Sequence, residues 1–164
     1  MSVQSADRVF AYNMWAWNRV FPSLAALPEE EYFAERPFFW HSLHGLAVHG
    51  FSSERNWLLR SRDGSSPQPA TVAEFPTLGA LHGSWGPLWV AWQEFLDSLT
   101  PSVLASPIQY RSDAGEGVGI LLDDVLRHVM NHGTEHRSQM TPVLAQLGHP
   151  TEPLDFSYFA ITEK

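Results

Sequence analysis

The sequence contains no cysteine, few basic residues and no long hydrophobic run. The lack of cysteine excludes disulfide bonds, cysteine-ligated zinc and a protein thiol nucleophile, and it fits a cytoplasmic protein. Lysine and arginine number 10 against 18 acidic residues and form no basic cluster, so we expect no binding to nucleic acid or to an anionic membrane surface. No apolar run approaches the ~20 residues that span a membrane, and the first residues lack the features of a signal peptide.

The 164 residues are 44% hydrophobic and include seven tryptophans, enough for one domain, 1–164, with a sizeable core. Hydrophobic periodicity predicts long helices over residues 3–27, 41–62, 77–99 and 121–148. A glycine-rich stretch within residues 100–120 indicates a small β-hairpin or an irregular excursion before the last helix. This pattern predicts an all-α four-helix bundle, and the long second connection permits a topology other than simple up-down.

The last predicted helix carries His132 and His136 four positions apart. Residues at this spacing lie about 40° apart and one turn along a helix, so both imidazoles can reach one point beside it. Their face also carries Val125, Val129, Met140 and Val143, and so it is expected to point toward the core. His128 lies nearer the edge of the same face, and Gln139 is close by.

Buried imidazoles are costly unless their nitrogens are hydrogen-bonded or bound to a metal ion. Neutral imidazole is a common metal ligand whose second nitrogen is held by an orienting partner. A pair of hydrogen-bonded core histidines is the alternative, and the residues alone leave both open. In the second predicted helix, His49 lies outside the apolar arc and is expected to face solvent or a polar cleft, whereas His41 and His44 are expected at the surface.

Three motifs together resemble those of the DinB/YfiT-like proteins, a superfamily of four-helix-bundle metalloproteins. They are Tyr12-Asn13-Met14-Trp15-Ala16, His49 followed eight residues later by Trp57-Leu58, and Asn131-His132-Gly133-Thr134-Glu135-His136-Arg137-Ser138-Gln139. They occur in the family's order across nearly the whole chain, and the third is the most specific. The chain departs from the family at Glu135, often a histidine there, and at Ser138, often a glycine.

The resemblance implies a divalent metal bound by His49, His132 and His136, and it is the resemblance that selects His49 over His41 and His44. Zinc or nickel is expected, with iron or manganese as alternatives. Three histidines leave coordination positions open, which is the catalytic pattern, with a coordinated water or thiol as the reacting group.

By the same resemblance, the expected reaction transfers a low-molecular-weight thiol to a small electrophilic substrate. Metal-dependent hydrolysis is one alternative, and a non-catalytic metal-binding or structural bundle is another. The resemblance also implies a homodimer.

Several polar residues are candidates to surround the metal ligands. These are Asn13, Ser53, Glu54, Asn56, His128, Glu135 and Gln139. Glu54 or Glu135 could orient a ligand or move a proton, although carboxylates at such positions are more often on the surface. Arg137 points off the metal face and is expected to serve a salt bridge or an interface. The role of His128 is not defined by the sequence, and the residues after Gly148 are expected to pack across the bundle or a partner subunit.

Overall fold

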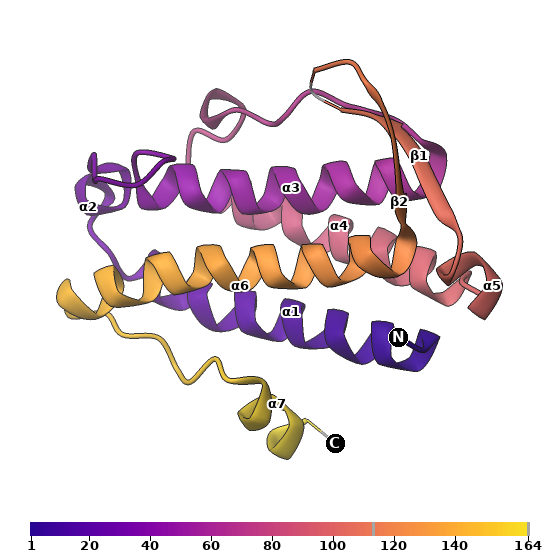
Figure 1. Ribbon diagram of the computed structural model, residues 1–164. Coiled ribbons are helices and arrows are strands. Elements are labelled where there is room, and N and C mark those ends of the chain that lie inside the picture. The colour runs from indigo at the N-terminus through magenta and orange to yellow at the C-terminus, as the bar shows by residue number, and fades with distance from the viewer. Residues whose placement is uncertain (113, 164) are drawn as a thin grey trace.

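A computed structural model describes residues 1–112 and 114–163 and contains four long helices packed side by side (Figure 1). These are α1 (Val3–Ala25), α3 (Leu43–Asp63), α4 (Leu78–Asp97) and α6 (Leu122–Gln146). The short elements are α2 (Glu29–Phe33), the 3-10 turn η1 (Val72–Glu74), α5 (Pro101–Leu104), β1 (Pro107–Arg111), β2 (Gly117–Leu121) and α7 (Phe156–Thr162). The predicted all-α bundle is confirmed. Asp113 in the predicted hairpin region and Lys164 at the end of the predicted domain lie outside the described residues.

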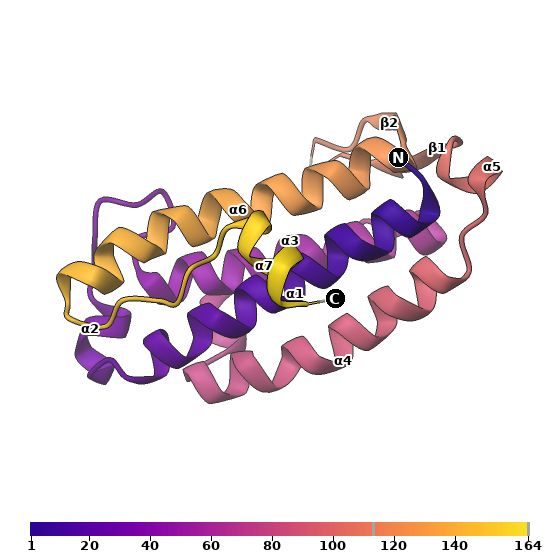
Figure 2. The same ribbon diagram turned by 90° about the horizontal axis from the view of Figure 1, so that it is seen from below.

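The four long helices do not follow a simple up-down order. Helices α1 and α6 run in one direction, and α3 and α4 both run in the other (Figures 1 and 2). Residues 64–77 therefore carry the chain back along α3 before α4 begins. Helix α6 packs against both α1 and α3, which places the last helix of the bundle beside the second long one.

The helix boundaries follow the capping chemistry of the sequence. The Thr77 hydroxyl accepts a hydrogen bond from the Ala80 amide at 3.1 Å, as the N-terminal cap of α4. Helix α4 then continues through Pro87 to Asp97. Gly148 follows α6 with a φ of 84°, the left-handed conformation expected for a glycine that ends a helix.

The excursion before the last helix is a β-hairpin, which is the first of the two alternatives that the sequence left open. Its antiparallel strands pair from Pro107 opposite Leu121 to Arg111 opposite Gly117. The hairpin packs against the second half of α3, where the rings of Trp57 and Tyr110 meet edge to face at 5.4 Å.

The core lies between the four long helices, and its largest fully buried side chains include Trp17, Trp85 and Trp92. A smaller cluster forms where α7 packs against α1 through Tyr12 and Phe159, so the C-terminal residues cover the bundle (Figure 2). Within the part of the chain that the structure describes, no helix combines the length and apolar character needed to cross a bilayer.

Candidate metal centre

The structure brings His49 of α3 together with His132 and His136 of α6. The Nε2 atom of His132 lies 3.0 Å from Nε2 of His49 and 3.1 Å from Nε2 of His136. His136 is buried and the other two are half-buried. The histidine cluster, defined by these three residues, therefore lies at the interface between the two helices.

Gln139 orients one ring of the cluster. Its Oε1 atom lies 2.8 Å from Nδ1 of His136. Because an amide oxygen can only accept a hydrogen bond, Nδ1 carries the proton and Nε2 presents a lone pair to the other two rings. One helical turn thus supplies both a potential metal ligand and its orienting partner.

Two of the nitrogen–nitrogen separations in the cluster match those of ligands on one metal ion. A neutral imidazole nitrogen carries either one proton or one lone pair, so Nε2 of His132 can form one linear hydrogen bond, yet it faces two nitrogens. Nitrogen ligands about 2.0–2.1 Å from one metal ion lie about 2.9–3.4 Å apart in octahedral or tetrahedral arrangements. The two observed separations fall in this range.

The electrostatics of the cluster favour the metal-binding form of its histidines. Burial, with smaller contributions from neighbouring histidines, lowers the pKa of His132 to about 3 and that of His49 to about 4. Both rings are therefore neutral at neutral pH, as a metal ligand must be. The indole of Trp40 stacks on His49, with 3.9 Å between ring centroids and 17° between planes.

The cluster leaves room for other ligands. Within the described residues, the group contains no fourth histidine, cysteine or carboxylate. His128 lies outside it, with its ring 5.4 Å from that of His132 and 5.1 Å from that of Trp57. Glu135 is exposed, and its negative charge opposes the lowering of the His128 pKa that burial causes.

Glu54 is buried, with 2% of its surface exposed, and this corrects the expectation of a surface carboxylate. Its Oε1 accepts hydrogen bonds from Nδ2 of Asn13 at 2.7 Å and from Nε1 of Trp17 at 3.1 Å. Burial raises its pKa to about 7, against the opposing effects of Asn13 and Arg137. These contacts turn Glu54 toward α1, so it links α3 to α1 across the core of the bundle.

Arg137 is also buried, and it points away from the cluster as the helical periodicity predicts. Its Nη1 donates to Oδ1 of Asn13 at 2.6 Å, and its Nη2 donates to the hydroxyl of Thr134 at 3.1 Å. Arg137 therefore joins α6 to α1. Of the other polar candidates, Ser53 is half-buried, and the buried Asn56 donates to the Pro67 carbonyl at 3.4 Å.

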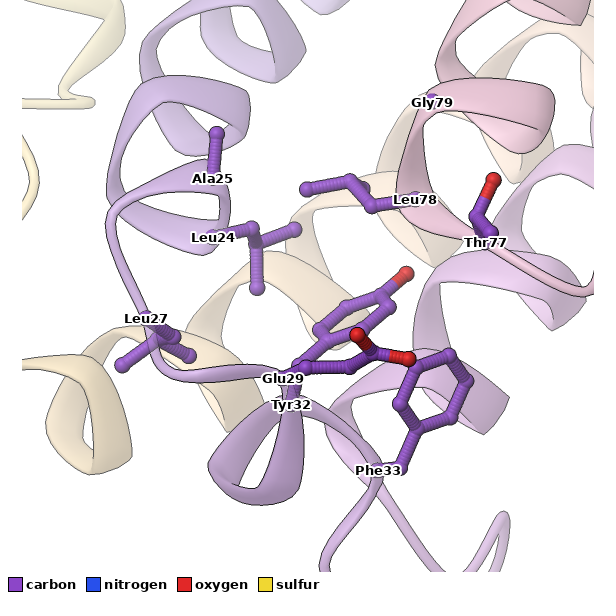
Figure 3. A pocket seen from close by; sticks show the side chains of 9 residues that line it. All are labelled: Leu24, Ala25, Leu27, Glu29, Tyr32, Phe33, Thr77, Leu78 and Gly79. Carbon is purple, nitrogen blue, oxygen red and sulfur yellow. The ribbon is translucent and has the colours of Figure 1, made fainter.

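His44 is buried rather than exposed, because Tyr32 covers it. Its Nδ1 lies 3.0 Å from the Tyr32 hydroxyl, and burial lowers its pKa. Tyr32 also lines a cavity of about 220 Å³ between the end of α1, α2 and the start of α4, with Leu24 and Leu78 across from it (Figure 3). No clustered histidine lines this cavity, so it lies apart from the metal centre.

The chain is similar to known proteins over nearly its whole length. A sequence model of the DinB family matches residues 1–163. The chain is also similar to the protein named Protein DinB of Bacillus subtilis (strain 168), with 25% identity over 166 residues that cover 97% of this chain and 95% of that protein.

Proposed function

Because this chain belongs to the DinB family and gathers three histidines at one point, we propose that it is a metal-dependent enzyme. In this proposal His49, His132 and His136 hold one divalent ion, zinc or nickel, and the reaction transfers a low-molecular-weight thiol to an electrophile. The convergence of three Nε2 atoms without a fourth protein ligand in the described residues carries the proposal, because it leaves positions for a small molecule.

Neighbouring residues and burial set the protonation states of the three histidines in the free protein. Gln139 fixes the tautomer of His136, and burial keeps His49 and His132 neutral. A divalent ion bound there supplies Lewis acidity, which lowers the pKa of a coordinated thiol or water. The bundle holds the ligands on two packed helices, so the site is rigid.

Thiol transfer suits a chain without cysteine, because the cosubstrate supplies the nucleophilic sulfur. The thiol gives up its proton to solvent, its sulfur forms a bond to the electrophilic carbon, and the leaving group departs with the electron pair of its bond. The protein needs to hold the sulfur and the carbon close together, which accounts for much of the catalysis available to such a site.

The test is the metal content of tag-free protein after reconstitution with zinc or nickel, compared with the His132→Ala and His136→Ala variants. We expect about one ion per chain in the wild type and in the control His128→Ala, and almost none in the two cluster variants. Metal-loaded wild type should then accelerate the reaction of glutathione, bacillithiol or mycothiol with monobromobimane. A metal-free wild type would overturn the proposal, and full metal loading without thiol consumption would restrict it to metal binding.

A further inference from the structure

A second feature of the structure lies directly beside the histidine cluster. A cavity of about 300 Å³ opens next to the ring of His49, between the start of α3 and the segment that precedes α4. Figure 1 shows that segment, with η1, passing over the first half of α3. Its walls are mainly apolar and come from Trp40, Val48, Pro69, Ala70 and Val72, and its polar side chains are those of His41, His49 and Thr71. No aspartate, glutamate, lysine or arginine is among the described residues that line it.

One wall of this cavity is held in place by an unusual turn. His41 has a φ of 64°, the only positive value among the described residues other than glycine, and such a conformation costs free energy. The turn places the Trp40 carbonyl where it accepts a hydrogen bond from the Ser42 amide at 2.8 Å. The same carbonyl occupies the space where a Cβ on residue 45 would lie, which explains the glycine there. The turn at His41 thus lies directly after Trp40, whose indole stacks on His49.

The opposite wall is tied to α3 by hydrogen bonds. The Ser52 hydroxyl accepts from the Ala70 amide at 2.7 Å. The Arg55 guanidinium donates to the Gln68 carbonyl at 2.8 Å, beside the bond from Asn56 to the preceding residue. Since both walls are fixed by α3, the cavity is formed before any ligand binds.

We propose that this cavity is the subsite for the electrophile and that it binds an uncharged aromatic group. Its lining offers ring surfaces and aliphatic carbon, with two imidazoles and one hydroxyl but no carboxylate, ammonium or guanidinium group among the described residues, so a charged group would lose its hydration without gaining a permanently charged partner. Its volume is at the lower end of ligand pockets, which suits one or two fused rings. The assignment to the electrophile rests on the proposed function, whereas the binding of an aromatic group does not.

The experiment measures binding of 1-naphthalenemethanol, an uncharged two-ring probe, to metal-free protein by calorimetry. Ala70→Phe should fill the cavity and weaken binding at least tenfold. Val72→Phe, at a position 52% exposed and therefore tolerant of a larger side chain, should weaken it too. The control Val90→Phe alters a similarly exposed valine on α4 and should change the dissociation constant less than twofold. The anionic 1-naphthoate should bind at least tenfold more weakly than the alcohol.

Saturable binding that both cavity variants weaken would support the subsite. Absence of binding to the wild type, or equal binding by the wild type and both cavity variants, would overturn it. Because neither metal nor thiol is present, this result is independent of the metal content. A protein that binds the probe in the cavity but no metal would retain the aromatic-binding cavity, and it would lose both the proposed enzyme function and the assignment of the cavity to the electrophile.

Discussion

Arg137 of α6 donates a hydrogen bond of 2.6 Å to Asn13 of α1, and Asn13 in turn donates one of 2.7 Å to Glu54 of α3. The three helices thus meet in one buried polar network. Glu54 lies on the same helix as His49, and Arg137 follows His136 directly, so the network fixes the spacing of the two helices that form the histidine cluster.

Gly133 leaves the space that this network occupies. A Cβ on Gly133 would lie 2.7 Å from Oδ1 of Asn13 and 3.0 Å from Nη1 of Arg137. Gly133→Ala should therefore lower the free energy of unfolding by about 1–3 kcal/mol in urea denaturation. The control Gly83→Ala, in a helical position with no heavy atom nearby, should raise it by about 0.4–1 kcal/mol. Equal effects of the two substitutions would contradict the close packing at Gly133.

The pH dependence of stability should report the burial of Glu54. Since its pKa rises from 4.5 to about 7 in the folded protein, the folded state holds a proton that the unfolded chain releases between these pH values. Its contribution to the free energy of unfolding therefore falls as the pH rises from about 4.5 to 7 and is constant above.

The variant Glu54→Gln removes this titration. The clustered histidines contribute equally to the pH dependence of stability in the wild type and in the variant. Relative to Glu54→Gln, the metal-free wild type should lose about 1–3 kcal/mol of stability between pH 5 and pH 8. Denaturation curves of both proteins at each pH give the difference. A difference that does not change with pH would show that Glu54 keeps an ordinary pKa.

Metal binding should release few protons even in acid. At pH 5.5, three histidines with an ordinary pKa of about 6.5 would be mostly protonated and would release nearly three protons per ion. Because the pKa values of His49 and His132 are about 4 and 3, these two release almost none. Calorimetry in two buffers of different ionisation enthalpy should give at most about one proton per ion, and two or more would refute the lowered pKa values.

Removing the orienting partner of His136 should weaken metal binding without abolishing it. Gln139→Ala leaves Nδ1 of His136 without the amide oxygen at 2.8 Å, and we expect a loss of about 10–100-fold in zinc affinity. Gln139→Glu keeps an acceptor there and should retain most of the affinity. Gln146→Ala, at an exposed position of the same helix, is the control in a competition titration with a chelator. Unchanged affinity in Gln139→Ala would exclude an orienting role.

Hydrophobic periodicity was sufficient to predict the four long helices, because each helix buries an apolar face and most ends carry a capping signal. The glycine-rich stretch before the last helix left a hairpin and an irregular excursion both open. The short helices α2, α5 and α7 could not be predicted in the same way. The helix α7 has seven residues and depends on contacts of Phe159 with Tyr12, which is distant in the sequence. Its position is set by packing rather than by local propensity.

The pairing of His132 with His136 follows from helical geometry, but the position of His49 beside them required the family resemblance. The burial of Glu54 was not predicted, although its spacing from apolar residues of the same helix indicated it. Glu54 lies three residues after Phe51 and four before Leu58, on the apolar arc of its helix. A carboxylate on such an arc has a buried partner, here Asn13 and Trp17, and the sequence alone does not identify partners on another helix.

His49 and His132 are 83 positions apart in the chain, yet their Nε2 atoms lie 3.0 Å from each other. An ion shared by them would be a removable cross-link that holds two distant segments of the chain together in the folded state. The added stability grows with the logarithm of the free ion concentration. The fraction of molecules that are folded would then depend on the supply of metal in the surroundings, through one contact between two helices.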